Sequence, residues 1–225
     1  MSAVHDNLER VRERIARACD ACGRDPAGVR LVAVSKTKPA DAIREAWDAG
    51  QRDFGENYAQ ELAEKAKALA GLEGLRWHFI GHLQSNKAKL VAPIASVVHS
   101  IDSPSLAKEL AKRAATAGRT LDALIEVNVG GEATKSGVTG SEIEELCAAI
   151  EALPALRLRG LMTMPPPGDL EVARKVFEAL VSLRNLHGGA ARLPELSMGM
   201  TDDLEVAIRC GATMVRVGTT IFGAR

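Results

Sequence analysis

The stretch LVAVSKTKPADAIREAWDAG (residues 31–50) contains the unit on which the expected fold is based. Its first four residues are apolar and predict a buried strand, which leads into Ser35 and Lys36. Residues 40–50 then follow a helical pattern that ends at Gly50. Lysine is seldom fully buried unless another group pairs with it. A buried strand that ends on Lys36 therefore raises the question of what this amine does.

The strand–helix unit recurs along the chain. Strands are predicted at 30–35, 52–56, 76–81, 96–101, 122–129, 157–164, 195–198 and 213–218. Helices are predicted at 3–22, 40–50, 57–71, 103–118, 140–153, 169–188 and 202–211, with a shorter link at 85–93. Eight strands, most followed by a helix, are typical of a (β/α)8 TIM-type barrel. We expect a single domain over residues 1–225 with an extra N-terminal helix, and a doubly wound open sheet is the alternative.

Composition argues against several classes of function. The 225 residues include 29 Lys+Arg and 29 Asp+Glu, so the formal net charge is zero. A balanced charge gives no electrostatic footprint for nucleic acid or an anionic membrane. Aromatic residues make up only 3%, which also disfavours a platform for stacking single-stranded bases.

The chain has no apolar run near the roughly 20 residues that a membrane span needs. Its N-terminal residues are charged and amphipathic and lack the apolar core of a secretory signal. The four cysteines are sparse and do not suggest a disulfide framework. We therefore expect a cytoplasmic protein.

In a barrel of this class the site lies at the carboxyl ends of the strands. Those ends are polar here, and they include Ser35, Lys36, Glu56, Asn57, His82, Asp102, Asn128, Thr163, Ser197 and Thr219. Lys36 could pair with a carboxylate such as Glu56, Asp102 or Glu126. Alternatively, its neutral amine could attack an aldehyde or ketone and form a Schiff base.

The last two strands predict a phosphate anchor. LSMGMTDD (196–203) and VRVGTTIFG (215–223) follow strands seven and eight, where this barrel class usually binds phosphate. Backbone approach, hydroxyl donors and a fixed positive charge would come from Gly199, Gly218, Ser197, Thr219, Thr220 and Arg216. A lysine that binds aldehydes and a phosphate site together suggest pyridoxal 5′-phosphate (PLP). An aldolase acting on a sugar phosphate would use the same parts and stays as an alternative.

At this point the sequence resembles the YggS/PROSC family of PLP-binding homeostasis proteins. The matching stretches are LVAVSKTKP (31–39), FGENYAQE (54–61), WHFIGHLQSNK (77–87), HSIDS (99–103), EVNVGGEATKSG (126–137), GLMTMPP (160–166), LSMGMTDDLEVAI (196–208) and VRVGTTIFGAR (215–225). The resemblance implies a barrel similar to the N-terminal domain of alanine racemase (PLP fold type III). It also implies an internal aldimine on Lys36 and phosphate contacts from residues 197–201 and 216–219. The implied cofactor-binding residues are Lys36, Asn57, Ser197, Met198, Gly199, Arg216, Gly218 and Thr219.

The resemblance also implies a role. Members of this family are regarded as holding PLP, delivering it to apo PLP-dependent enzymes, and balancing vitamin B6 and amino-acid pools without established catalysis. We expect a monomer. A PLP-dependent racemase or decarboxylase is the alternative, but a racemase needs acid–base groups on both faces of the substrate carbon. The chain has a single tyrosine, Tyr58, and too few residues for a second domain after the barrel.

Overall fold

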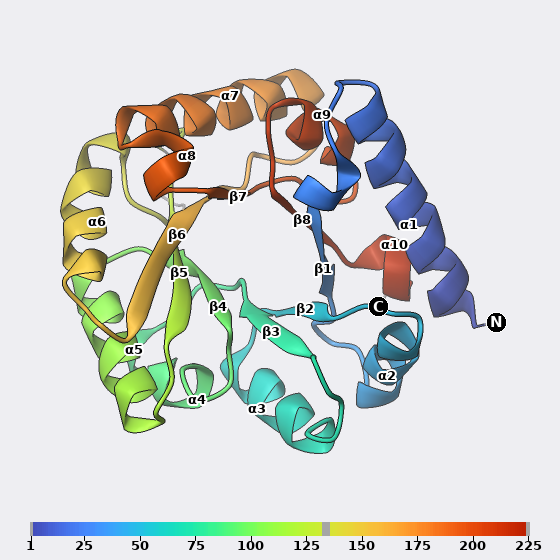
Figure 1. Cartoon of the computed structure of the whole chain (residues 1–225), viewed down its shortest axis with the longest axis horizontal. Helices are drawn as coiled ribbons and strands as arrows, with labels where there is room; N and C mark the ends of the chain where they lie inside the picture. The colour runs from blue at the N-terminus through green and yellow to red at the C-terminus, as the bar shows by residue number, and fades with distance from the viewer. Residues whose placement is uncertain (1, 132–135, 224–225) are drawn as a thin grey trace.

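Eight parallel strands close into a barrel in the order of the sequence, and β1 pairs with β8. The computed structural model describes residues 2–131 and 136–223. The strands are β1 (Arg30–Val34), β2 (Asp53–Glu56), β3 (Arg76–Phe79), β4 (Val97–Ile101), β5 (Leu121–Glu126), β6 (Leu156–Met162), β7 (Glu195–Ser197) and β8 (Met214–Val217). All eight predicted strands are present, and closure of the sheet confirms the barrel over the open sheet (Figure 1).

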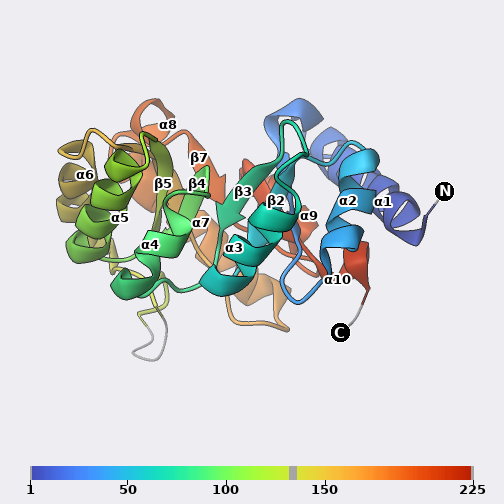
Figure 2. The same ribbon diagram turned by 90° about the horizontal axis from the view of Figure 1, so that it is seen from below.

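A shell of helices surrounds the strands (Figure 1). The α-helices of the described residues are α1 (Ala3–Asp20), α2 (Ala40–Asp48), α3 (Ala59–Ala68), α4 (Ala88–Val91), α5 (Pro104–Thr116), α6 (Ile143–Glu151), α7 (Leu170–Leu186), α8 (Gly189–Arg192), α9 (Leu204–Arg209) and α10 (Thr219–Phe222). Short 3-10 turns are η1 (Pro26–Gly28), η2 (Ser85–Lys87) and η3 (Gly140–Glu142). In the side view of Figure 2, the loops that follow β1 and β6 project from the same end of the barrel.

The predicted extra helix is α1, which packs on the outside of the barrel against α2, α9 and α10 (Figure 1). Its buried face includes Leu8, Val11 and Ile15, as the apolar spacing predicts. Predicted element ends are less accurate. The helix predicted at 57–71 begins at Ala59, so Asn57 lies in the bend after β2. The link at 85–93 contains η2 and α4. None of the described helices combines the length and the apolar character that crossing a bilayer requires.

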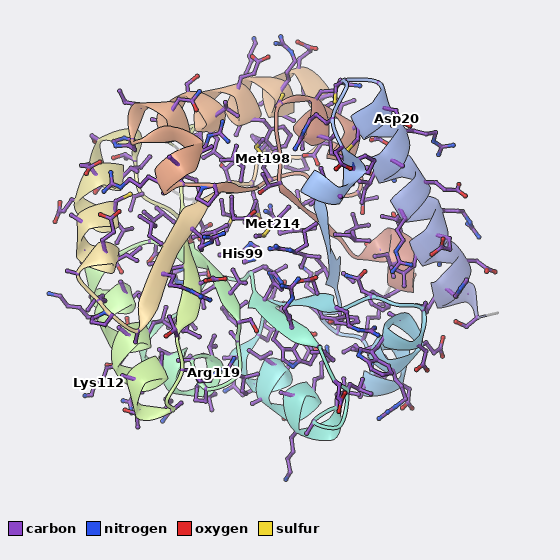
Figure 3. All side chains as sticks on the ribbon, in the orientation of Figure 1. Asp20, His99, Lys112, Arg119, Met198 and Met214 are labelled. Atoms are coloured by element: carbon purple, nitrogen blue, oxygen red, sulfur yellow. The ribbon has the colours of Figure 1, made fainter. Side chains whose placement is uncertain are left out.

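The barrel buries both apolar and polar side chains. Successive strand residues point alternately toward the helices and toward the barrel interior. The main apolar core includes Ile43, Phe54, Leu110 and Phe177. A small separate cluster consists of Val97, Leu124 and Met162. Beside these, the strands bury the polar side chains of Asp53, Glu56, His78, His99, Ser197 and Arg216. Figure 3 places His99 in the middle of the ring of strands. Buried polar groups need partners, and those partners define the site.

Candidate functional site

A cavity of about 170 Å³ at the carboxyl ends of β1 and β8 brings five predicted residues together. Lys36, Asn57, Arg216, Gly218 and Thr219 all line it. The rest of its wall is apolar and consists of Val34, Ile80, Met164 and Met200. An apolar cavity with a few convergent polar groups is the usual form of a small-molecule site.

Lys36 lies in the turn directly after β1 and is half-buried. None of the carboxylates that the structure describes lies within ion-pair distance of its amine. Glu56, one of its predicted partners, accepts instead from Lys65 Nζ at 2.7 Å and from Ser35 Oγ at 2.6 Å. Burial raises the pKa of the Glu56 carboxyl, although the hydrogen bonds from Lys65 and Ser35 oppose this effect. The Lys36 amine therefore faces the cavity without a described counter-ion.

Arg216 is a buried cation, with 4% of its surface exposed. Its guanidinium donates from Nη1 to Ser197 Oγ at 2.6 Å and from Nη2 to the Thr163 carbonyl at 3.0 Å. No described carboxylate forms an ion pair with it. Burial lowers the pKa of Arg216 to about 10, so the side chain stays charged at neutral pH. A buried charge without a paired anion is costly, which favours an anionic or electron-rich ligand beside it.

A chain of hydrogen bonds through the barrel interior connects Arg216 on β8 to Asp53 on β2. Ser197 Oγ lies 2.8 Å from His99 Nδ1, and His99 Nε2 lies 2.9 Å from His78 Nδ1. His78 Nε2 is 2.8 Å from Asp53 Oδ1. We call these five residues, from Arg216 to Asp53, the barrel relay.

The barrel relay has one consistent direction of donation. The Asp53 carboxylate only accepts, so His78 Nε2 carries a proton and its neutral ring accepts at Nδ1. His99 then donates from Nε2 and accepts the Ser197 hydroxyl proton at Nδ1. Ser197 Oγ in turn accepts from Arg216, which is the direction that a permanent cation requires.

The pKa shifts agree with neutral histidines in the barrel relay. Burial lowers the pKa of His78, although Asp53 opposes this effect. Burial also lowers the pKa of His99 well below its usual value, and the positive charge of Arg216 acts in the same direction. For Asp53, burial acts to raise the pKa, but the hydrogen bonds from His78 and Arg76 and the charge of Arg76 lower it overall. Asp53 is therefore the charged end of the relay.

The remaining predicted residues lie behind the cavity wall. Ser197 and Met198 are fully buried, and Ser197 reaches the cavity only through Arg216. Gly199 has a φ of 92°, and a Cβ there would lie 2.4 Å from the Ala207 Cβ. Gly218 does line the cavity, and a Cβ there would lie 3.0 Å from the Val34 carbonyl oxygen. Both glycines therefore permit close packing around β8.

Asp203 lies at the start of α9. It is the N-cap residue of α9, yet its carboxylate makes no capping hydrogen bond to that helix. Instead, Asp203 Oδ1 accepts from the Met200 amide at 2.5 Å. The side chain therefore ties down the loop between β7 and α9.

A second cavity of about 320 Å³ adjoins the first and shares Asn57, Ile80 and Met164 with it. Glu126 and His82 also line this cavity. Burial, followed by the nearby charge of Asp102, raises the pKa of Glu126. Across residues 2–131 and 136–223, no three His, Cys, Asp or Glu side chains are placed to hold a metal ion.

Sequence reasoning missed the polar groups that support the site. The burial of Lys65 could have been predicted, because it shares one face of α3 with Ala59 and Leu62 at helical spacing. His78 on β3 and His99 on β4 are both fully buried. Neither was predicted to take part in a chain of hydrogen bonds.

A family model and a solved structure define the class of barrel to which this chain belongs. The family model for the alanine racemase N-terminal domain matches residues 6–225. Alanine racemase from Corynebacterium glutamicum shares the fold, with a TM-score of 0.67 and 18% identity over 99% of this chain and 61% of that one. The chain is thus a barrel of the alanine racemase N-terminal class.

Closer relatives identify the family. The pyridoxal phosphate homeostasis protein of Escherichia coli (strain K12) is 47% identical over 232 residues, covering 100% of this chain and 98% of the relative. That of Pseudomonas aeruginosa is 48% identical over 227 residues, covering 100% and 97%. The structure of PipY from Synechococcus elongatus PCC7942 with PLP bound has a TM-score of 0.84 and 35% identity, covering 98% of this chain and 100% of PipY. The chain belongs to the family of pyridoxal phosphate homeostasis proteins.

Proposed function

We propose that this protein binds PLP at the carboxyl end of the barrel and holds it as a Schiff base on Lys36. The observation that carries the proposal is the placement of Lys36 and Arg216 on one cavity, each without a described carboxylate partner. The relatives named for PLP homeostasis and the PLP-bound PipY structure support the same assignment.

The residues of the cavity fit PLP. The cofactor carries an aldehyde, a phosphate and an electron-poor ring, and its aldehyde condenses with a lysine amine. Arg216 provides a cation, and the amides of Thr219 and Thr220 begin α10 and so have no acceptor within that helix. Asn57 Oδ1 is buried and has no hydrogen-bond partner among the residues that the structure describes, so it is able to accept from a ligand. We retain Ser197, Met198 and Gly199 in the proposed site as the segment that supports Arg216 and the wall beside it.

We further propose that residues 1–225 act as one domain that stores PLP in the cytoplasm and passes it to apo PLP-dependent enzymes. This role would balance vitamin B6 and amino-acid pools without catalysis. Exposed apolar side chains near the mouth support contact with another protein. Of five exposed large apolar residues among those described, four follow the carboxyl ends of β2 or β6, namely Tyr58, Met164, Leu170 and Val172. We expect the free protein to be a monomer.

The covalent assignment is tested by incubation with PLP, borohydride reduction and peptide mass spectrometry. We expect a pyridoxyl adduct on Lys36 and none in Lys36→Ala. Lys38→Ala, which changes the next lysine in the sequence, is the matched control and should retain the adduct. An adduct that persists in Lys36→Ala would move the assignment to another lysine, and scattered labelling would contradict the site.

A further inference from the structure

The turn that carries Lys36 has a strained backbone. Thr37, the next residue, has a φ of 63° and is the one described residue other than glycine with a positive φ. A β-branched side chain is sterically disfavoured in this left-handed region. Such a conformation persists only where surrounding contacts hold it.

Lys65 on α3 provides these contacts on one side of the turn. The residue is buried, with 6% of its surface exposed. Its Nζ donates to the Ser35 carbonyl at 2.6 Å and to Glu56 Oε1 at 2.7 Å, and it lies 2.8 Å from Glu61 Oε1. An ammonium group has three N–H donors, so these three acceptors use all of them. One acceptor is the carbonyl directly before Lys36.

Glu61 connects Lys65 to Thr37, the residue that follows Lys36. Its Oε1 accepts from the Thr37 amide at 2.6 Å, and the same oxygen contacts Lys65 Nζ. Lys65 thus reaches the residue before Lys36 directly and the residue after it through Glu61. We call Lys65, Glu61 and Glu56 the turn clamp.

Stability alone is a weak explanation for the turn clamp. Burying an ion pair costs desolvation that the attraction between the charges often only offsets, and apolar residues of similar size serve as well or better. Hydrogen bonds from a buried ammonium instead fix directions, because each donor is committed to one acceptor. Two of the contacts of the clamp go to main-chain atoms on either side of Lys36.

We propose that Lys65 is a positioning residue for Lys36. It holds the 35–37 turn in its strained conformation, so that the Lys36 amine enters the cavity at one place. Lys65 itself does not line the cavity. The inference rests on the proposed function, because it assigns Lys65 a role in PLP capture by Lys36.

The first test is Lys65→Met, which keeps the length of the side chain and removes its donors. We expect the rate of adduct formation on Lys36, trapped with borohydride over time, to fall roughly tenfold or more, as expected when a reacting group is misplaced. Far-UV circular dichroism should stay unchanged. Lys67→Met, at an exposed position of the same helix, is the matched control and should react like the wild type. An unchanged rate in Lys65→Met would overturn the proposal.

Rescue separates positioning from a general structural role. Glycine adopts a positive φ without a steric penalty, so Thr37→Gly allows the turn to keep its shape without the clamp. We expect Thr37→Gly alone to react at nearly the wild-type rate, and Thr37→Gly combined with Lys65→Met to recover most of the lost rate. A double variant as slow as Lys65→Met would show that Lys65 does not act through this turn.

Should Lys65→Met fail to fold, Lys65→Met combined with Glu56→Gln removes both buried charges together. The same loss of rate and the same rescue by Thr37→Gly are expected in that background. Adduct formation on the wild type separates a failure of PLP binding from a failure of the turn clamp. No adduct on wild-type Lys36 would contradict PLP binding itself, whereas a wild-type adduct with no effect of Lys65 variants would contradict only the turn clamp.

Discussion

Lys36 and Arg216 reach the cavity from adjacent strands. In the parallel pair β1–β8, Val32 lies opposite Arg216 and Ala33 opposite Val217, and both Lys36, just after β1, and Arg216 line the same cavity. A lysine amine and a fixed cation then share one small space. In such a space a ligand with both a carbonyl and an anionic or electron-rich group satisfies both residues at once.

At the residue scale, Arg216→Gln should weaken PLP retention by roughly tenfold or more, because hydrogen bonds to charged groups contribute about 1.5–3 kcal/mol. The apo protein should lose little stability, since the variant also removes a buried charge that has no described carboxylate partner. Equilibrium dialysis of PLP and urea unfolding of the apo protein measure the two effects.

The control for this variant is Arg157→Gln. Arg157 is near the start of β6, away from the cavity, with 64% of its side chain exposed. Its replacement should leave PLP retention unchanged. Equal losses in both variants would indicate a general effect of charge and would contradict a specific role for Arg216.

At the scale of elements, the barrel relay couples five strands through their inner faces. Asp53 comes from β2, His78 from β3, His99 from β4, Ser197 from β7 and Arg216 from β8. Each member has a hydrogen-bond partner on another strand. A satisfied polar network of this kind rigidifies a core, whereas a broken one leaves costly unpaired groups. The barrel relay therefore helps to hold the Arg216 guanidinium in its orientation beside the cavity.

The neutral histidines of the barrel relay predict a pH dependence of stability. Unfolded histidines titrate near pH 6.5, while burial lowers the pKa of both His78 and His99 in the folded protein. Below about pH 6.5 the unfolded chain therefore binds more protons than the folded one. The free energy of unfolding should fall by about 1 kcal/mol per histidine between pH 7.5 and pH 5.5.

Urea unfolding of the apo protein at these two pH values checks the prediction. The raised pKa values of Glu56 and Glu126 act in the opposite direction at more acid pH, which is why the comparison stops at 5.5. In His99→Gln the difference between the two pH values should shrink, because one neutral histidine is gone. Equal stability of the wild type at both pH values would contradict neutral buried histidines.

At the scale of the whole molecule, residues 2–131 and 136–223 form one barrel surrounded by helices (Figure 1). Its single tyrosine, Tyr58, is the N-cap residue of α3 and is 52% exposed. A racemase needs a proton donor and an acceptor on opposite faces of the substrate carbon. Tyr58 does not line the Lys36 cavity, so it is not placed as the second acid–base group of a racemase.

The PLP-loaded protein should therefore racemise L-alanine at a rate close to that of free PLP, whereas enzymes accelerate reactions by roughly 10⁶-fold or more. Chiral chromatography of alanine after long incubation measures the rate, with an authentic alanine racemase as the positive control. Turnover at enzymatic rates that disappears in Lys36→Ala would establish catalysis and overturn the carrier role.

Features that depend on the local pattern of residues were predictable from the amino-acid sequence. Alternating strand and helix periods predicted all eight strands, because the period of apolar residues is a property of neighbouring residues. The same reasoning placed Lys36, Arg216, Gly218 and Thr219 at the carboxyl ends of strands, which a barrel brings to one mouth.

Hydrogen bonds between residues far apart in the sequence could be found only in the three-dimensional structure. Lys65 contacts the Ser35 carbonyl across 30 residues of sequence, and His99 contacts Ser197 across 98. Glu56, which was considered as an alternative partner for Lys36, pairs with Lys65 of α3 instead. A hydrogen bond needs its donor and acceptor about 3 Å apart and nearly in line. These partners therefore depend on the closure of the barrel and on which face each helix turns toward it. Sequence spacing does not contain that information.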